Sequence, residues 1–151
     1  MTTRRHFLLA PGALLLAQCG GPPPPAKVDI MIKAAADQNP DASGKPVAVA
    51  VRIYSLTAAG KFNAADVYAL VEREKATLGE EGAGMEEVVM RPDSSRTVNL
   101  SPRAGVHHIG VAVLFRDIDR AKWRAIAPIA ASGLTRLNLS ISGNKAVLVA
   151  A

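Results

Sequence analysis

Apolar residues at every second position are the feature that most restricts the fold of this chain. In the segment 137–142, Leu137, Leu139 and Ile141 alternate with polar residues throughout. Successive side chains on a β-strand point to opposite faces, so this period of two predicts a strand with one buried face. Alternating or short apolar segments bounded by turn residues predict strands over 28–33, 47–54, 85–91, 96–100, 106–115, 123–129, 137–142 and 145–149.

The segment 106–115 is the most apolar part of the chain beyond its first 18 residues. Ile109 and Val111 would share one face while Gly110 and Ala112 share the other, which predicts a central strand covered on both sides. One helix is predicted over 62–73, with Asn63 as its N-cap. The chain is therefore expected to be all-β: a two-sheet antiparallel β-sandwich with one short added helix.

The first 18 residues are typical of a bacterial export leader. Arg4 and Arg5 precede an uncharged run at 7–17, as in the basic and apolar regions of a signal peptide. The run is about half of the roughly 20 residues that a membrane-crossing helix needs. We expect a signal peptide over 1–18, and its arginine pair leaves both the general and the twin-arginine export routes open.

Cys19 follows this leader and is the only cysteine of the chain, which excludes an internal disulfide. The segment 16–19 resembles the bacterial lipobox, at which a lipid is attached to the cysteine and the leader is cut off before it. We expect Cys19 to carry a lipid that holds the protein on a membrane without crossing it. An aspartate after the cysteine would resemble an inner-membrane retention signal, and the presence of Gly20 there favours the outer membrane.

Residues 19–26 form the expected lipidated tether, and 27–151 form the folded domain. Four prolines at 22–25 supply no N–H donors and fix φ, which predicts a semi-rigid spacer. Loss of Arg4 and Arg5 with the leader lowers the formal net charge of +5 to +3. No basic stripe accompanies this mild charge, so a nucleic-acid partner is not expected.

The sequence contains no arrangement of residues typical of a metal site or a catalytic site. His107 and His108 are adjacent, so on a strand they would point to opposite faces and could not hold one metal together. The chain has no Gly-x-Ser-x-Gly motif and no glycine cluster that opens a helix. We expect no enzyme activity, no metal, no cofactor other than the lipid and no small-molecule substrate.

Charges of both signs alternate densely at 116–124. The segment could be a recognition patch, or a turn whose opposite charges pair with one another at the surface. Exposed ion pairs of this kind contribute about 0–1 kcal/mol each, and we favour the second interpretation.

Three segments and Cys19 together resemble the TssJ family, the outer-membrane lipoproteins of the bacterial type VI secretion system. The segments are 39–56, 62–70 and 115–124, and the resemblance extends in order over nearly the whole chain. It implies a transthyretin-like β-sandwich with an added helix, anchored through Cys19 at the periplasmic face of the outer membrane. It also implies a partner, the periplasmic carboxy-terminal domain of TssM, within a membrane complex that includes TssL.

The loop between the first two strands is the part that the family links to TssM contact. In this chain it would consist of Asp37, Gln38, Asn39, Pro40, Asp41, Ala42, Ser43, Gly44 and Lys45. The alternative is a connection that only joins two strands. The loop is longer than a hairpin needs, and binding residues often lie on loops held by a rigid scaffold, so we favour the binding role.

Two other classes of protein would share the fold or the composition of this chain. A transthyretin-like hydrolase would end with a Tyr-Arg-Gly-Ser tail, whereas this chain ends Val-Leu-Val-Ala-Ala. A periplasmic inhibitor or small-ligand carrier lipoprotein with a transthyretin-like fold is the alternative that remains open.

Overall fold

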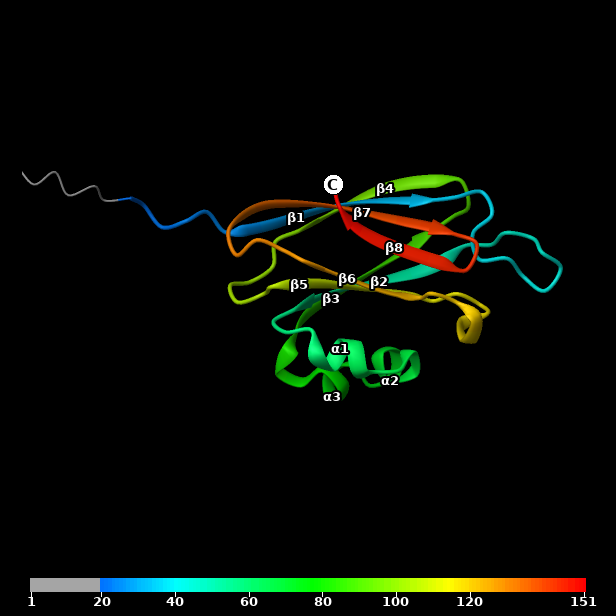
Figure 1. Ribbon diagram of the computed structural model, residues 1–151, viewed down its shortest axis with the longest axis horizontal. Helices are drawn as coiled ribbons and strands as arrows, with labels where there is room; N and C mark the ends of the chain where they lie inside the picture. The colour runs from blue at the N-terminus through cyan, green and yellow to red at the C-terminus, as the bar shows by residue number, and fades with distance from the viewer. Residues whose placement is uncertain (1–19) are drawn as a thin grey trace, which may run out of the picture.

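Two four-stranded sheets pack face to face in the computed structural model, which describes residues 20–151 (Figure 1). The strand orders are β4-β1-β7-β8 and β3-β2-β5-β6. The strands are β1 Ala26–Ala34, β2 Val49–Leu56, β3 Gly82–Met90, β4 Ser94–Leu100, β5 His108–Val113, β6 Arg124–Pro128, β7 Gly133–Ser142 and β8 Lys145–Ala150. The predicted two-sheet β-sandwich is confirmed. In this range no helix is both long and apolar enough to span a bilayer.

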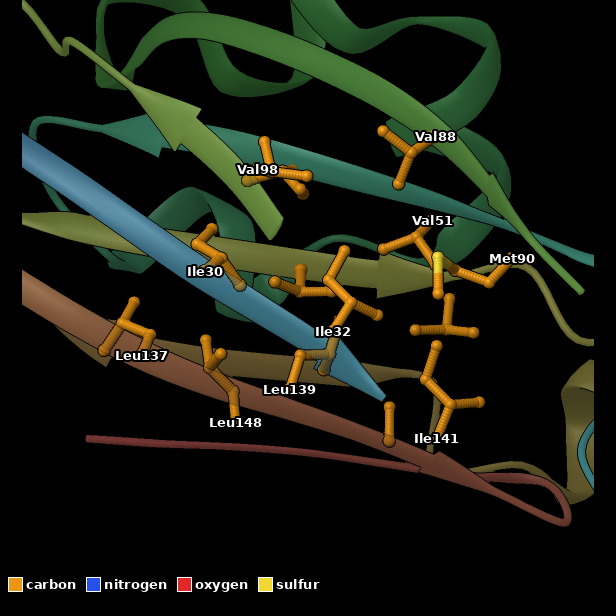
Figure 2. Close-up of a cluster of buried hydrophobic side chains, with 14 of the residues drawn as sticks. Ile30, Ile32, Val51, Val88, Met90, Val98, Leu137, Leu139, Ile141 and Leu148 are labelled. Atoms are coloured by element: carbon orange, nitrogen blue, oxygen red, sulfur yellow. The ribbon is translucent and has the colours of Figure 1, made fainter. Parts of the chain in front are cut away.

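The core lies between the sheets and contains the residues selected by the period of two. Figure 2 shows side chains of β1, β2 and β7 pointing toward one another. Buried members of this core include Val28, Ile30 and Ile32 from β1, Val51 and Ile53 from β2, and Leu137, Leu139 and Ile141 from β7. Their alternation with exposed residues sets which face of each strand is inside.

One strand pair departs from the expected antiparallel arrangement. β1 runs parallel to β7, with Ile30 opposite Leu137 and Ile32 opposite Leu139, while its other neighbour, β4, is antiparallel. Short turns predict antiparallel pairing between consecutive strands. β1 and β7 are distant in sequence, so no turn between them could have revealed their direction.

The predicted helix over 62–73 is wrong in its extent, because three short helices occupy this region. They are α1 Gly60–Ala64, α2 Val67–Glu72 and α3 Glu74–Leu78, followed by the 3-10 turn η1 Gly79–Glu81. Asn63 lies inside α1 and is not an N-cap. Asp66 is the N-cap of α2, because its backbone is extended and its side chain accepts a hydrogen bond from the Ala69 N–H at 2.8 Å.

These helices cover the outer face of the β3-β2-β5-β6 sheet (Figure 1). Phe62 and Leu70 pack there against Tyr54 and Ala112 in a second apolar cluster. A Cβ atom at Gly110 would lie 2.8 Å from the Phe62 ring, so only glycine permits this close approach. The prediction that 106–115 contains a central strand covered on both sides is therefore confirmed.

Candidate functional site

The β1–β2 loop projects from one end of the sandwich, and residues 20–25 leave from the opposite end (Figure 1). The 3-10 turn η2, Ile118–Arg120, and the β7–β8 turn at 143–144 lie at the same end as the loop. We call this the loop end, and the other the tether end. The sequence-predicted binding residues 37–45 all belong to the loop end.

Asn39 is the residue that joins the connections at this end. It is 2% exposed, and its side chain bonds in two directions: Nδ2 donates to the Ala48 carbonyl at 2.9 Å, and Oδ1 accepts from the Arg116 N–H at 2.8 Å. Its own N–H donates to the Gly143 carbonyl at 2.7 Å. Three connections that are far apart in sequence are thus held together by the side chain and the backbone of one buried residue.

Gln38 is fully buried beside it and ties the loop to a fourth connection. Its Nε2 donates to the Met90 carbonyl at 2.8 Å, where β3 ends, and to the Val47 carbonyl at 3.3 Å. Buried amides of this kind satisfy backbone carbonyls that no strand partner reaches. Gln38 and Asn39 therefore support the loop from beneath and do not belong to its exposed surface.

Asp41 shapes the tip of the loop. Its Oδ1 accepts hydrogen bonds from the Ser43 N–H, the Ser43 hydroxyl and the Lys45 N–H at 2.7–2.9 Å. These bonds favour the charged carboxylate, and together with nearby Arg116 they hold the pKa of Asp41 below its ordinary value of 3.8. Gly44 completes the turn at φ +85°, a backbone conformation that glycine adopts without strain.

The predicted residues that remain accessible form the rim and tip of the loop. Asp37, Ala42, Ser43, Gly44 and Lys45 are exposed, and Pro40 and Asp41 are half-buried. Pro40 and Pro46 face each other in an isolated bridge that closes the base of the tip. The conformation of the loop is consequently defined by its own hydrogen bonds.

A groove of about 350 Å³ runs between this tip and the neighbouring connections. Its far side is formed by Arg116, Asp117 and Asn144, three residues that sequence reasoning did not place at the site. Arg116 reaches the loop through a contact spanning 77 positions of sequence, and no local pattern reports such a contact. The dense charge at 116–124 was the one available signal.

The charges of that segment do not pair with one another as we expected. Among the described residues the single ion pair within 4.0 Å joins Arg52 of β2 and Glu87 of β3. Arg116 and Asp117 instead line the groove, and Arg124 donates from its guanidinium to carbonyls at the end of α1, those of Phe62, Asn63 and Ala65. The start of the segment therefore belongs to the groove at the loop end, and its last residue holds the helices against the sheet.

The predicted lipid site, Cys19, and the predicted leader over 1–18 lie outside the described residues. In the described part of the tether, the Pro24 carbonyl accepts a hydrogen bond from the Gly133 N–H at 3.3 Å. β1 then starts at Ala26.

The two adjacent histidines lie at the start of β5. His107 is exposed just before β5 and His108 is half-buried at its start. Across 20–151, no three His, Cys, Asp or Glu side chains gather closely enough to hold a metal ion.

Comparison with known families identifies what kind of protein has this fold and this loop. A family model described as type VI secretion lipoprotein, VasD, EvfM, TssJ, VC_A0113 matches residues 26–144. The chain belongs to the TssJ family. It is thus a type VI secretion lipoprotein, a structural component of the machinery and not a member of an enzyme family. A search of curated protein sequences finds no match.

Solved structures of type VI secretion proteins have the same fold. The lipoprotein TssJ1 from Pseudomonas aeruginosa is 28% identical, with a TM-score of 0.81 over 85% of this chain and 98% of that one. A chain in a type VI membrane complex is 26% identical, with a TM-score of 0.72 over 82% and 97%. A third match, 26% identical with a TM-score of 0.70 over 83% and 98%, is a chain in a structure described as the TssM carboxy-terminal domain from EAEC.

Proposed function

We propose that this TssJ-family protein is held on the outer membrane by a lipid on Cys19 and binds the periplasmic carboxy-terminal domain of TssM through its loop end, in a membrane complex with TssL. The observation that carries the proposal is the arrangement of the two ends. A pre-formed loop faces away from the point where the tether leaves (Figure 1). Such a protein can hold a membrane with one end and a partner with the other.

β1 connects these two functions directly. Its nine residues, Ala26–Ala34, separate the tether from the loop by about 30 Å at the usual rise of a strand. β1 lies inside its sheet with a hydrogen-bonded neighbour on each side, β4 and β7. A load applied between membrane and partner would therefore act on a strand that is held along its whole length.

The loop end suits a protein partner better than a small ligand. Its groove is open, and the tip residues beside it are held in place before binding by the Asp41 turn and by buried Gln38 and Asn39. A surface that is already ordered loses little conformational entropy when a partner binds. The similarity to chains in a membrane complex and in a TssM structure supports TssM as that partner.

The binding proposal is tested by changing exposed tip side chains while leaving the supporting amides intact. Ala42→Arg combined with Lys45→Glu alters bulk and charge at the tip without removing a side-chain hydrogen bond. We expect this variant to bind the TssM periplasmic domain at least about ten-fold more weakly in a calorimetric titration. The matched control, Ala104→Arg with Lys27→Glu at the tether end, should bind within about two-fold of the parent. Equal affinity of all three proteins would refute the role of the loop.

The anchor is tested separately with Cys19→Ser. This variant should lose membrane attachment, because no acyl chain remains to partition into the bilayer. Its folded domain should still bind the TssM domain with unchanged affinity. Recovery of the variant in the outer-membrane fraction would show that something other than the lipid attaches the protein.

A further inference from the structure

We propose that the tether end of the sandwich rests on the surface of an anionic phospholipid bilayer, so that the domain stands upright with its loop end pointing away from the membrane. The contact surface consists of Lys27, Arg103, Ala104, Ala131 and Leu134. This inference rests on the proposed lipid anchor and adds to it a second, electrostatic attachment made by the folded domain.

The first observation is how little free tether the structure leaves. The Pro24 carbonyl is bound by the Gly133 N–H, so only residues 20–23 separate the lipidated position from the fold. Four residues in a polyproline conformation extend about 12 Å. The headgroup layer of a bilayer takes up about 5–7 Å of that length. The tether end is therefore kept within about one Debye length of the headgroups, where charges on the two surfaces still act on each other.

The second observation is the composition of this end. Connections 101–107 and 129–132 lie where the tether leaves, and neither contains a carboxylate (Figure 1). They consist largely of alanine, glycine, proline and serine, with Arg103 exposed. At the loop end, by contrast, the connections carry five carboxylates, Asp37, Asp41, Asp93, Asp117 and Asp119, interspersed with five basic residues, Lys45, Arg91, Arg116, Arg120 and Lys122. An end without carboxylates can approach anionic headgroups without repulsion.

Lys27 and Leu134 extend this surface onto the adjoining sheet. They are paired in the parallel register of β1 and β7, at the tether end of both strands. Lys27 is exposed and Leu134 is 46% exposed, which places a cation beside an apolar side chain. This combination suits a membrane interface, where a basic group reaches phosphates and an apolar group enters the boundary with the acyl chains.

Asp29 lies on β1 two positions after Lys27, opposite Arg136 in the β1–β7 register, and accepts a hydrogen bond from the Asn99 amide. The other carboxylates near this end belong to the other layer and indicate how the domain is oriented. Glu81 accepts from the Lys61 N–H beside the connection at 57–59, and Glu86 lines a hollow shared with Arg103. Contact with anionic lipid is therefore expected on the side of the β4-β1-β7-β8 sheet and not on the side of the helices. Such a contact is weak alone, at about five-fold per basic side chain. The lipid anchor makes the contact between domain and lipid intramolecular, which raises the effective concentration of lipid at this surface and so the fraction of protein in contact with it.

The test uses the full mature lipoprotein in vesicles of phosphatidylethanolamine and phosphatidylglycerol at three to one. Because Cys19 is the only cysteine and carries the lipid, Ala131→Cys introduces a single thiol for a fluorophore, and Ser43→Cys is the matched site at the loop end. A headgroup-attached quencher should quench the label at 131 strongly and the label at 43 hardly at all. Lys27→Glu with Arg103→Glu should reduce quenching at 131 by about five-fold or more while flotation with vesicles persists.

Lys45→Glu with Arg120→Glu makes the same charge change at the loop end and should leave quenching at 131 unchanged. Equal quenching at 43 and 131, or no effect of the Lys27 and Arg103 reversals, would overturn the inference and leave the lipid anchor standing. Loss of flotation in the parent protein would overturn the anchor and the inference together.

Discussion

Both ends of the sandwich consist of connections between strands, but different interactions hold the two ends in shape. At the loop end, buried amides bind the backbone of four connections into one unit. At the tether end, small residues lie at the surface and backbone bonds join the segments, from the Ile129 N–H to the His107 carbonyl and from the Gly133 N–H to the Pro24 carbonyl. This difference agrees with the two proposals. A specific protein partner at the loop end requires a surface of fixed shape, whereas a fluid lipid surface at the tether end does not.

The comparison of the two ends can be tested by substitution, and the largest loss of stability is expected at Asn39. Removing its amide leaves the Ala48 carbonyl and the Arg116 N–H without partners, and each such loss costs about 1–3 kcal/mol. Asn39→Ala also places alanine at φ +46°, which adds about 1 kcal/mol of strain. Urea unfolding should show a loss of about 4 kcal/mol for Asn39→Ala and about 1 kcal/mol less for Asn39→Gly. A loss below about 1 kcal/mol in both would mean that the loop end is not held by this residue.

The second largest loss of stability is expected on substitution of Gln38. Gln38→Met keeps the volume of the side chain but leaves the Met90 carbonyl unsatisfied, at a cost of about 2 kcal/mol. We expect this loss in the same unfolding experiment, together with faster amide exchange in the β1–β2 loop. Unchanged stability would contradict the role of Gln38 as a support.

A smaller and pH-dependent effect is expected at Asp41. Its pKa is lower in the folded protein than in the unfolded chain, so its contribution is present above the ordinary value of 3.8 and disappears as pH falls through the lower, folded value. The amide signals of Ser43 and Lys45 should therefore titrate with a midpoint below 3.8 in NMR spectra. Asp41→Asn serves as the control, because its amides should show no such titration. A midpoint at or above 3.8 would show that the turn does not stabilise the carboxylate.

The smallest effect should come from the tether end. Arg103→Ala removes an exposed side chain for which the structure shows no hydrogen bond or ion pair among residues 20–151, so stability should change by no more than about 0.5 kcal/mol. Thermal or urea unfolding of the soluble domain provides the measurement. A loss comparable to that of Gln38→Met would break the comparison, because both ends would then be structurally constrained.

Much of the architecture could be predicted because the strands follow a local rule. Val28, Ile30 and Ile32 were assigned to one buried face from spacing alone, and the structure places all three in the core. The helix at 62–73 could not be predicted correctly from spacing, because Asp66 uses its side chain to start a new helix where the apolar pattern runs on. Capping competes with periodicity there, and it prevails because it satisfies an otherwise unpaired N–H.

The sequence predicted that residues 37–45 form a loop, but not which of them are exposed. Its polar residues suggested an exposed loop, yet Gln38 and Asn39 are buried because the carbonyls of Ala48 and Met90 need donors inside the fold. Arg116 and Asp117 were noticed as charges but not as neighbours of the loop. Such neighbours become apparent only when distant connections meet at one end of the sandwich.

By itself, the sequence determined the class of fold, the buried face of each strand, and the motif at Cys19 on which the expected anchor rests. These depend on interactions between residues a few positions apart, so periodicity and spacing report them. The tertiary structure alone decided the parallel pairing of β1 with β7, the hydrogen bonds that join the connections around Asn39, and the placement of the β1–β2 loop and the tether at opposite ends. Those features depend on contacts between distant segments, whose free energy is gained only when the whole chain has closed around its core.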